Sequence, residues 1–250
     1  MSGHSKWSTI KRQKGVADAR RGAVFTKLSR EIIIAAKQGG GDTAMNFKLR
    51  LAVQRARAQN MPNDNIERAI AKGSGGGQDG EQFDEITYEG YWPGGTAILV
   101  SVLTDNRNRT VAEVRHRFSR SGGNLGETGS VAWQFEAKGL ITIPVGQNDP
   151  DDLALKAIDA GADDVQVQGD VLEVQTEPGS LEAVRKVLEA AGAEIENADF
   201  AMVPKVTIEL EEKAAHQTLK LIEALEDLDD VQRVYSNADF TDEVLESYEA

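Results

Sequence analysis

The sequence of 250 residues contains no cysteine. This absence excludes disulfide bonds, thiolate zinc sites and cysteine nucleophiles, and it fits a reducing compartment. Long apolar runs are also absent. The longest, Ile32–Ala36 and Ala97–Val100, fall far short of the ~20 residues that a membrane-spanning helix needs. Because the first residues also lack the apolar core of a secretory signal, we expect a cytoplasmic protein with no membrane partner.

Signatures of catalysis and cofactor binding are missing as well. His4, His116 and His216 lie far apart, without the spacing of paired metal ligands. Neither a Gly-x-Ser-x-Gly elbow nor a Gly-x-x-x-x-Gly-Lys loop occurs. The segment Ser74–Gly80 contains the Gly-x-Gly-x-x-Gly spacing of dinucleotide sites, but a helical pattern precedes it and a strand pattern follows, so its composition indicates a flexible linker. We expect no enzyme activity, metal, cofactor or small-molecule substrate.

Acidic residues are scarce in the N-terminal part of the chain, and basic residues are scarce in its C-terminal part. The net charge is −13, yet residues 1–75 hold 15 Lys and Arg against 5 Asp and Glu, a net +10. Residues 141–250 hold 7 against 27, a net −20. Such asymmetry is typical of a chain whose basic part meets nucleic acid. The alternative is that the basic helices are merely solvated and pair with the acidic part of the same chain.

The basic N-terminal segment is the first candidate nucleic-acid site. Its cations would contact phosphates, and the flat indole of Trp7 would stack on an unpaired base. Two alternatives remain open: the segment is a solubilising tail, or Trp7 is a hydrophobic anchor for the helices. The candidate residues are His4, Lys6, Trp7, Lys11, Arg12, Lys14, Arg20 and Arg21.

A second basic segment follows a predicted strand. Arg107 and Arg109 lie in a strand-to-helix loop, where backbone N–H groups at a helix N-terminus bind anions well. Thr110 and Glu113 fit a capping box that would start the helix, which continues the basic character. The alternative is that these arginines pair with acids of the C-terminal lobe.

The apolar pattern divides the chain into three domains. Residues 1–75 predict a basic domain of three helices, with the second over Ala44–Gln59. Strand patterns over 83–91, 96–103 and 131–135 indicate an α/β domain of residues 79–136, which the tail 204–250 completes. Between these parts, 137–203 carry a βαββαβ pattern, typical of a ferredoxin-like unit. The predicted fold class is α+β and multidomain: a three-helix domain followed by two ferredoxin-like α/β domains, one inserted in the other.

Several motifs closely resemble those of the YebC family, which includes the mitochondrial translational activator of cytochrome c oxidase. The resemblance covers essentially the whole chain, although Trp92 stands where the family pattern leads us to expect a small residue. The motifs are Gly3-His-Ser-Lys-Trp7, Gly39-Gly-Gly-Asp42, Tyr88-Glu-Gly-Tyr91, Pro93-Gly-Gly95, Thr104-Asp-Asn-Arg-Asn-Arg-Thr-Val-Ala-Glu-Val-Arg115, Gly122-Gly-Asn-Leu-Gly126 and Gly129-Ser-Val-Ala132.

The resemblance implies a regulator of gene expression that binds nucleic acid through Lys6, Trp7, Lys11, Arg12 and their neighbours. Members of the family carry the label of probable transcriptional regulators that bind DNA, and are also placed on the ribosome, where they help translation through stall-prone stretches such as consecutive prolines. Our leading hypothesis is a ribosome-associated translation factor whose partners are the ribosome, ribosomal RNA or tRNA. The alternative is a DNA-binding transcriptional regulator.

Overall fold

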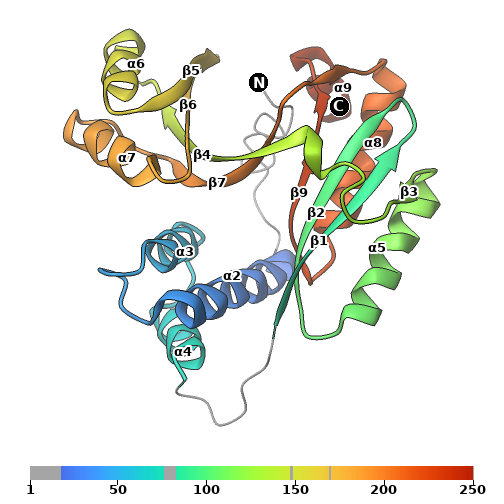
Figure 1. The fold of residues 1–250 in the computed structure, drawn as a ribbon, viewed down its shortest axis with the longest axis horizontal. Coiled ribbons are helices and arrows are strands. Elements are labelled where there is room, and N and C mark those ends of the chain that lie inside the picture. The colour runs from blue at the N-terminus through green and yellow to red at the C-terminus, as the bar shows by residue number, and fades with distance from the viewer. Residues whose placement is uncertain (1–17, 76–82, 147–148, 169, 250) are drawn as a thin grey trace. The chain divides into compact units, whose positions relative to one another are not determined.

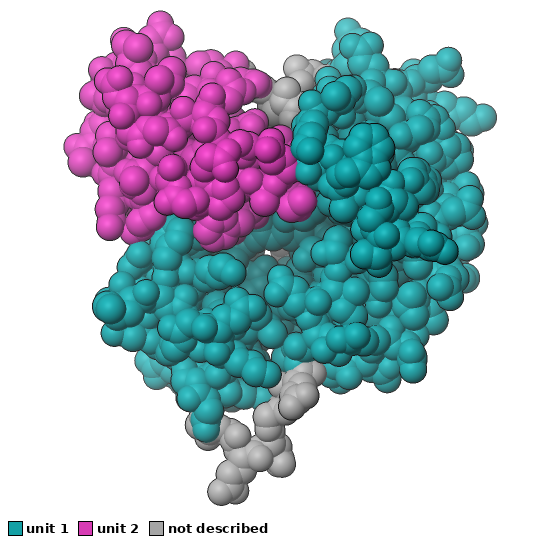
Figure 2. All heavy atoms as spheres, in the orientation of Figure 1, with its two compact units in different colours: residues 1–135, 204–250 teal, residues 136–203 magenta. Residues whose placement is uncertain are grey.

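The structure is a computed structural model that describes residues 18–75, 83–146, 149–168 and 170–249. The chain forms two compact units, one of residues 1–135 and 204–250 and the other of residues 136–203 (Figure 2). Within the described residues, no helix combines the length and the apolar character needed to cross a bilayer.

Three helices form the N-terminal part of the first unit (Figure 1). They are α2 (Asp18–Gly39), α3 (Phe47–Ala58) and α4 (Asn63–Gly73). Their buried faces share one apolar cluster that includes Ile32, Leu49 and Ile66.

The predicted start of the second helix at Ala44 is wrong, because Asn46 caps α3. The Asn46 side chain accepts a hydrogen bond from the Leu49 N–H at 3.1 Å and donates to the carbonyl oxygens of Ala35 and Gly40. The side chain of Asn46 therefore bonds both the end of α2 and the start of α3.

The α/β part of the first unit is a four-stranded sheet with two helices on one face. Its strand order is β3-β1-β2-β9, and all three pairings are antiparallel. The elements are β1 (Asp84–Trp92), β2 (Thr96–Thr104), α5 (Arg107–Ser121), β3 (Asn124–Leu125), α8 (Glu212–Glu226) and β9 (Val231–Ser236). The tail adds β8 (Ile208–Glu209), β10 (Ala238–Asp239) and α9 (Asp242–Glu249), a helix that the sequence reading did not anticipate.

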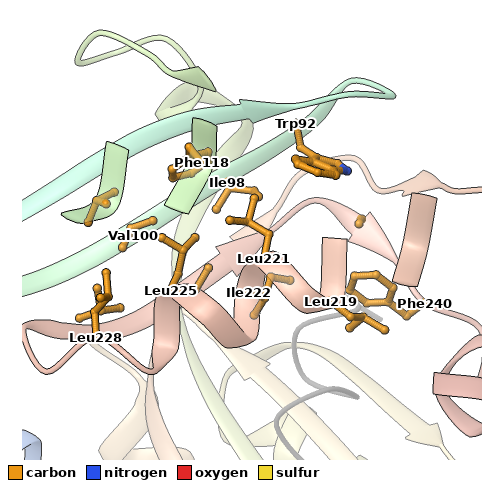
Figure 3. Packing of buried hydrophobic residues seen from close by; sticks show 14 of the residues in the cluster. Trp92, Ile98, Val100, Phe118, Leu219, Leu221, Ile222, Leu225, Leu228 and Phe240 are labelled. Carbon is orange, nitrogen blue, oxygen red and sulfur yellow. The ribbon is translucent and has the colours of Figure 1, made fainter. Parts of the chain in front are cut away.

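The core of this part lies between the sheet and the helices α5 and α8 (Figure 3). Ile98 and Val100 of β2 meet Leu221 and Leu225 of α8, and all four side chains are fully buried. Trp92, the departure from the family pattern, is 5% exposed and belongs to this core. A large apolar side chain is therefore accommodated at the end of β1.

The second unit has the predicted βαββαβ order. Its sheet order is β5-β6-β4-β7, as in ferredoxin-like folds. The elements are β4 (Phe135–Pro144), α6 (Pro150–Asp159), β5 (Ala162–Gln168), β6 (Val171–Thr176), α7 (Leu181–Ala190) and β7 (Asn197–Pro204). The helix α6 starts at Pro150, and the side chain of Asp149 caps it by accepting a hydrogen bond from the Asp151 N–H. The α+β, multidomain fold class is confirmed.

Two local predictions are wrong. The helix α5 starts at Arg107 rather than at the capping box, because the Asn106 side chain accepts the Arg109 N–H at 3.1 Å. Residues 132–134 form a short 3-10 helix instead of a strand. The N–H groups of Val131 and Ala132 donate to the carboxylate of Glu89, which keeps them out of a sheet ladder.

We predict that Gly90→Ala destabilises the first unit by about 1–3 kcal/mol, the usual cost of overpacking a core. A Cβ at Gly90 would lie 2.3 Å from the ring of Phe118. The matched control is Gly22→Ala in α2, where an added Cβ meets nothing within 4 Å and the better helix propensity of alanine would be neutral or stabilising. Urea unfolding curves of both variants check this, and equal stability of the two would contradict it.

Candidate nucleic-acid interface

Most of the first candidate site lies outside the described residues. This holds for His4, Lys6, Trp7 and the three cations Lys11, Arg12 and Lys14. Arg20 and Arg21 belong to the first turns of α2, but their side chains are not among those described. Direct contact of this segment with nucleic acid therefore stays a prediction.

The second candidate site lies at the junction of β2 and α5. The strand ends at Thr104, Asn106 caps the helix, and Arg107 opens it. Asn106 is extended, with φ −143° and ψ 92°, so the chain turns directly from strand to helix. This turn places Arg107 and Arg109 on the surface, with 66% and 42% of their side chains exposed.

Both arginines are paired with carboxylates. The Arg107 Nε donates to Asp84 Oδ2 at 2.6 Å. The Arg109 Nη2 donates to Asp105 Oδ1 at 2.8 Å and to Asp230 Oδ2 at 2.7 Å. One of the three acids, Asp230, belongs to the C-terminal tail, as the alternative reading of this segment supposed. The Arg107–Asp84 pair is exposed on both sides, and such a pair is weak enough for an incoming phosphate to compete for the guanidinium group. Arg109 is held more firmly, because its partner Asp230 is buried.

Asp230 connects this junction to the helical part of the unit. Its side chain is only 3% exposed and accepts hydrogen bonds from the hydroxyl groups of Thr104 at 3.1 Å and Thr110 at 2.6 Å. The guanidinium of Arg30, in α2, lies 3.0 Å from the other carboxylate oxygen. Sequence reasoning missed both Asp230 and Arg30, because no local pattern relates residues 120 to 200 positions apart.

The pKa of Asp230 reflects two opposed effects. Burial raises the pKa of this carboxyl, since a buried charge loses its hydration. Hydrogen bonds from Thr110 and Arg109 and the charge of Arg30 outweigh burial, so the pKa lies below its ordinary value. The carboxylate is therefore ionised and holds its donors in place at neutral pH.

The outward face of α5 extends the cationic surface. Arg115 and Arg120 are exposed and Arg117 is half-buried. In the described parts of the chain, these three side chains form no ion pair or hydrogen bond. Arg109, His116 and Arg120 lie seven and four residues apart, which places them along one stripe of the helix. A phosphate backbone would find cations along the length of α5.

Potential metal ligands and histidines are dispersed over the described residues. They contain no group of three or more His, Cys, Asp or Glu side chains placed to hold a metal ion. The exposed His116 stands alone on α5, and the ring of His216 bonds Ser247 at 2.9 Å and packs edge-on against Tyr248. The latter contacts fasten α9 to α8.

Two family models match the chain. One describes the TACO1/YebC protein N-terminal domain and matches residues 5–76, and the other describes the TACO1/YebC second and third domain and matches residues 83–238. A probable transcriptional regulatory protein of Dehalococcoides mccartyi is 56% identical over 99% of this chain and 98% of its own length. Another protein of that description, from Desulforapulum autotrophicum, is 54% identical over 99% of this chain and all of its own length.

A solved structure resembles the fold. The crystal structure of a conserved hypothetical protein from Aquifex aeolicus superposes with a TM-score of 0.83 and is 47% identical. The match covers 91% of this chain and 94% of that one.

We predict that Asp230→Asn lowers the free energy of unfolding at pH 7 by about 1–3 kcal/mol, the usual cost of leaving buried partners mismatched. Since the folded-state pKa of Asp230 is lowered, its contribution is full above the unfolded pKa of ~3.9 and is lost as the pH falls through the folded value. The gap between wild type and variant should therefore shrink below about pH 4.

Denaturation at a series of pH values measures this gap. The control is Asp105→Asn, which removes an acid that is 49% exposed and should cost much less. A gap that is absent at pH 7, or that widens in acid, would contradict the role given to Asp230.

Proposed function

The chain belongs to the TACO1/YebC family, and we propose that it is a non-enzymatic regulator of gene expression that acts as a ribosome-associated translation factor. In this proposal, its basic N-terminal domain and the cations of α5 bind ribosomal RNA or tRNA. Its role is to relieve stalling at sequences that are difficult to translate, such as proline-rich stretches.

The charge distribution is the observation that carries the proposal. A net +10 on residues 1–75 stands against −20 on residues 141–250. Lys and Arg side chains that neutralise phosphates release counterions, and this release supplies most of the sequence-independent affinity for nucleic acid. The acidic part repels phosphates, so the binding that charge drives is concentrated on the basic helices and on α5. The label of regulatory protein borne by the relatives agrees with a nucleic-acid partner.

A DNA-binding transcriptional regulator is the second candidate, and the printed names of the relatives favour it. The helices α3 and α4 even resemble a helix-turn-helix, since residues 59–62 join them and Asn60 has a φ of 57°. In such motifs the second helix enters the major groove.

The exposed side chains of α4 argue against this mode of binding. They include the carboxylates of Asp64 and Glu67, next to Arg68, whose guanidinium already donates to Asn65 and the Asp64 carbonyl. Two carboxylates on a recognition helix would meet phosphates and most base edges with repulsion. This argues against α4 as the recognition helix of a helix-turn-helix.

We predict that the protein sediments with ribosomes on a sucrose gradient of cell lysate, and that raising the salt concentration releases it. The triple variant Lys6→Ala/Lys11→Ala/Arg12→Ala should leave the ribosomal fractions at lower salt than wild type. Removing Lys186, Lys213 and Lys220, exposed lysines of the acidic part, is the matched control and should change nothing. Sedimentation of the wild type with the nucleoid instead would favour the transcriptional candidate.

A further inference from the structure

Two aromatic side chains are exposed on the first unit, close to each other. Trp133 in the short 3-10 helix is 67% exposed and Tyr91 on β1 is 42% exposed. Trp92, the residue after Tyr91, is by contrast 5% exposed and packs in the core, as most tryptophan side chains do. An indole left in water forfeits a large gain from burial, so its exposure calls for an explanation.

Both aromatic rings are fixed to the same carbonyl oxygen. The Trp133 Nε1–H donates to the Ser130 carbonyl at 3.0 Å, and the Tyr91 hydroxyl donates to that same oxygen at 2.6 Å. The polar atom of each ring is thus satisfied inside the protein. The remaining exposed surface of the rings is apolar and held in one orientation.

A buried carboxylate fixes the loop that carries Trp133. Glu89 is 4% exposed and accepts three backbone N–H groups, from Gly129 at 2.6 Å, Val131 at 2.7 Å and Ala132 at 2.8 Å. Burial raises the pKa of the Glu89 carboxyl, but these three bonds together bring it below its ordinary value. The side chain of Val131 is fully buried beneath the loop. The aromatic pair is therefore preorganised rather than loosely attached.

Gln134 follows Trp133 directly along the chain and joins the loop to two residues of the C-terminal tail, one of them a lysine. The carbonyl of Gln134 accepts the N–H of Lys205 at 2.8 Å, and its side-chain oxygen accepts the Asn237 amide at 3.1 Å. The side chain of Lys205 is exposed. In the described parts of the chain it has no ion pair. An aromatic pair with a lysine beside its loop has the composition of a stacking site for single-stranded nucleic acid.

We propose that Trp133 and Tyr91 form a stacking site for an unpaired base of single-stranded RNA, with Lys205 as the neighbouring cation for the backbone phosphate. The inference rests on the proposed function but names a site in the α/β part, separate from the basic N-terminal domain. A protein partner fits less well, because a stable protein interface buries ~800 Å² on each side, far more than two rings offer. A base has the size of an indole and needs only its face.

The test measures affinity for a labelled, unstructured RNA of about 20 nucleotides, with the full-length chain, at several salt concentrations. Trp133→Ala should weaken binding roughly 5- to 150-fold, the range for loss of one stacked base. The slope of affinity against salt should stay unchanged, since no phosphate contact is lost. Trp133→Phe should retain part of the affinity. Met45→Ala removes an apolar side chain that is 84% exposed and should have no effect.

An abasic oligomer of the same length supplies the second arm. This oligomer lacks bases, so wild type and Trp133→Ala should bind it equally. The free Trp133→Ala and Trp133→Phe proteins should both melt at the wild-type temperature. If Trp133→Ala binds the intact RNA as tightly as wild type while the Lys6/Lys11/Arg12 triple variant loses affinity, the stacking site is wrong and the proposed function stands. If the wild type binds no RNA, the stacking site and the proposed function are both wrong. An equal loss on the abasic oligomer would also refute stacking.

Discussion

A single buried carboxylate, Asp230, links the parts of the first unit. It receives Arg30 from α2, Thr104 from the end of β2, and Thr110 and Arg109 from the first turns of α5. A carboxylate in this position is costly unless it is fully paired. Three hydrogen-bond donors and the ion pair with Arg30 therefore fasten the end of β2, the first turns of α5 and the helix α2 to one carboxylate. The surface arginines of α5 owe their placement to this buried charge.

The distribution of charge then determines which surfaces can meet RNA. Residues 136–203 contain 4 Lys and Arg against 15 Asp and Glu, a net −11, so the second unit repels phosphates. Arginines without ion-pair partners among the described residues lie instead on α5. Glu89 acts as Asp230 does, because it is a buried carboxylate that accepts several hydrogen bonds, here from the loop of residues 129–132. In both places a buried carboxylate organises a surface that is available for binding. The arginines supply charge, and the rings of Trp133 and Tyr91 supply faces for stacking.

Local sequence signals predicted the elements that local interactions decide. The three N-terminal helices and the βαββαβ order of residues 137–203 both follow from apolar patterns among residues within a few positions of each other. The loop at 129–134 escaped prediction, because its backbone donors bond Glu89, some 40 residues away. The start of α5 was placed wrongly for a different reason, since the local cap at Asn106 competes with the capping-box pattern that begins at Thr110. Pairing of Arg109 with Asp230 spans 121 residues. The sequence identified these arginines as candidates and left open that acids of the C-terminal lobe pair with them, but it could not show which acid does so.

Ribosome profiling beside RNA sequencing, in cells with and without the protein, tests the central claim most directly. A translation factor of this kind predicts that ribosomes in cells without it pause at particular codons, with proline-rich stretches foremost, while transcript levels shift only as a secondary effect. Restoring the wild-type chain should remove the pauses, and the triple variant lacking Lys6, Lys11 and Arg12 should not. Altered transcript levels at promoters that the purified protein occupies, with unchanged pausing, would contradict the account.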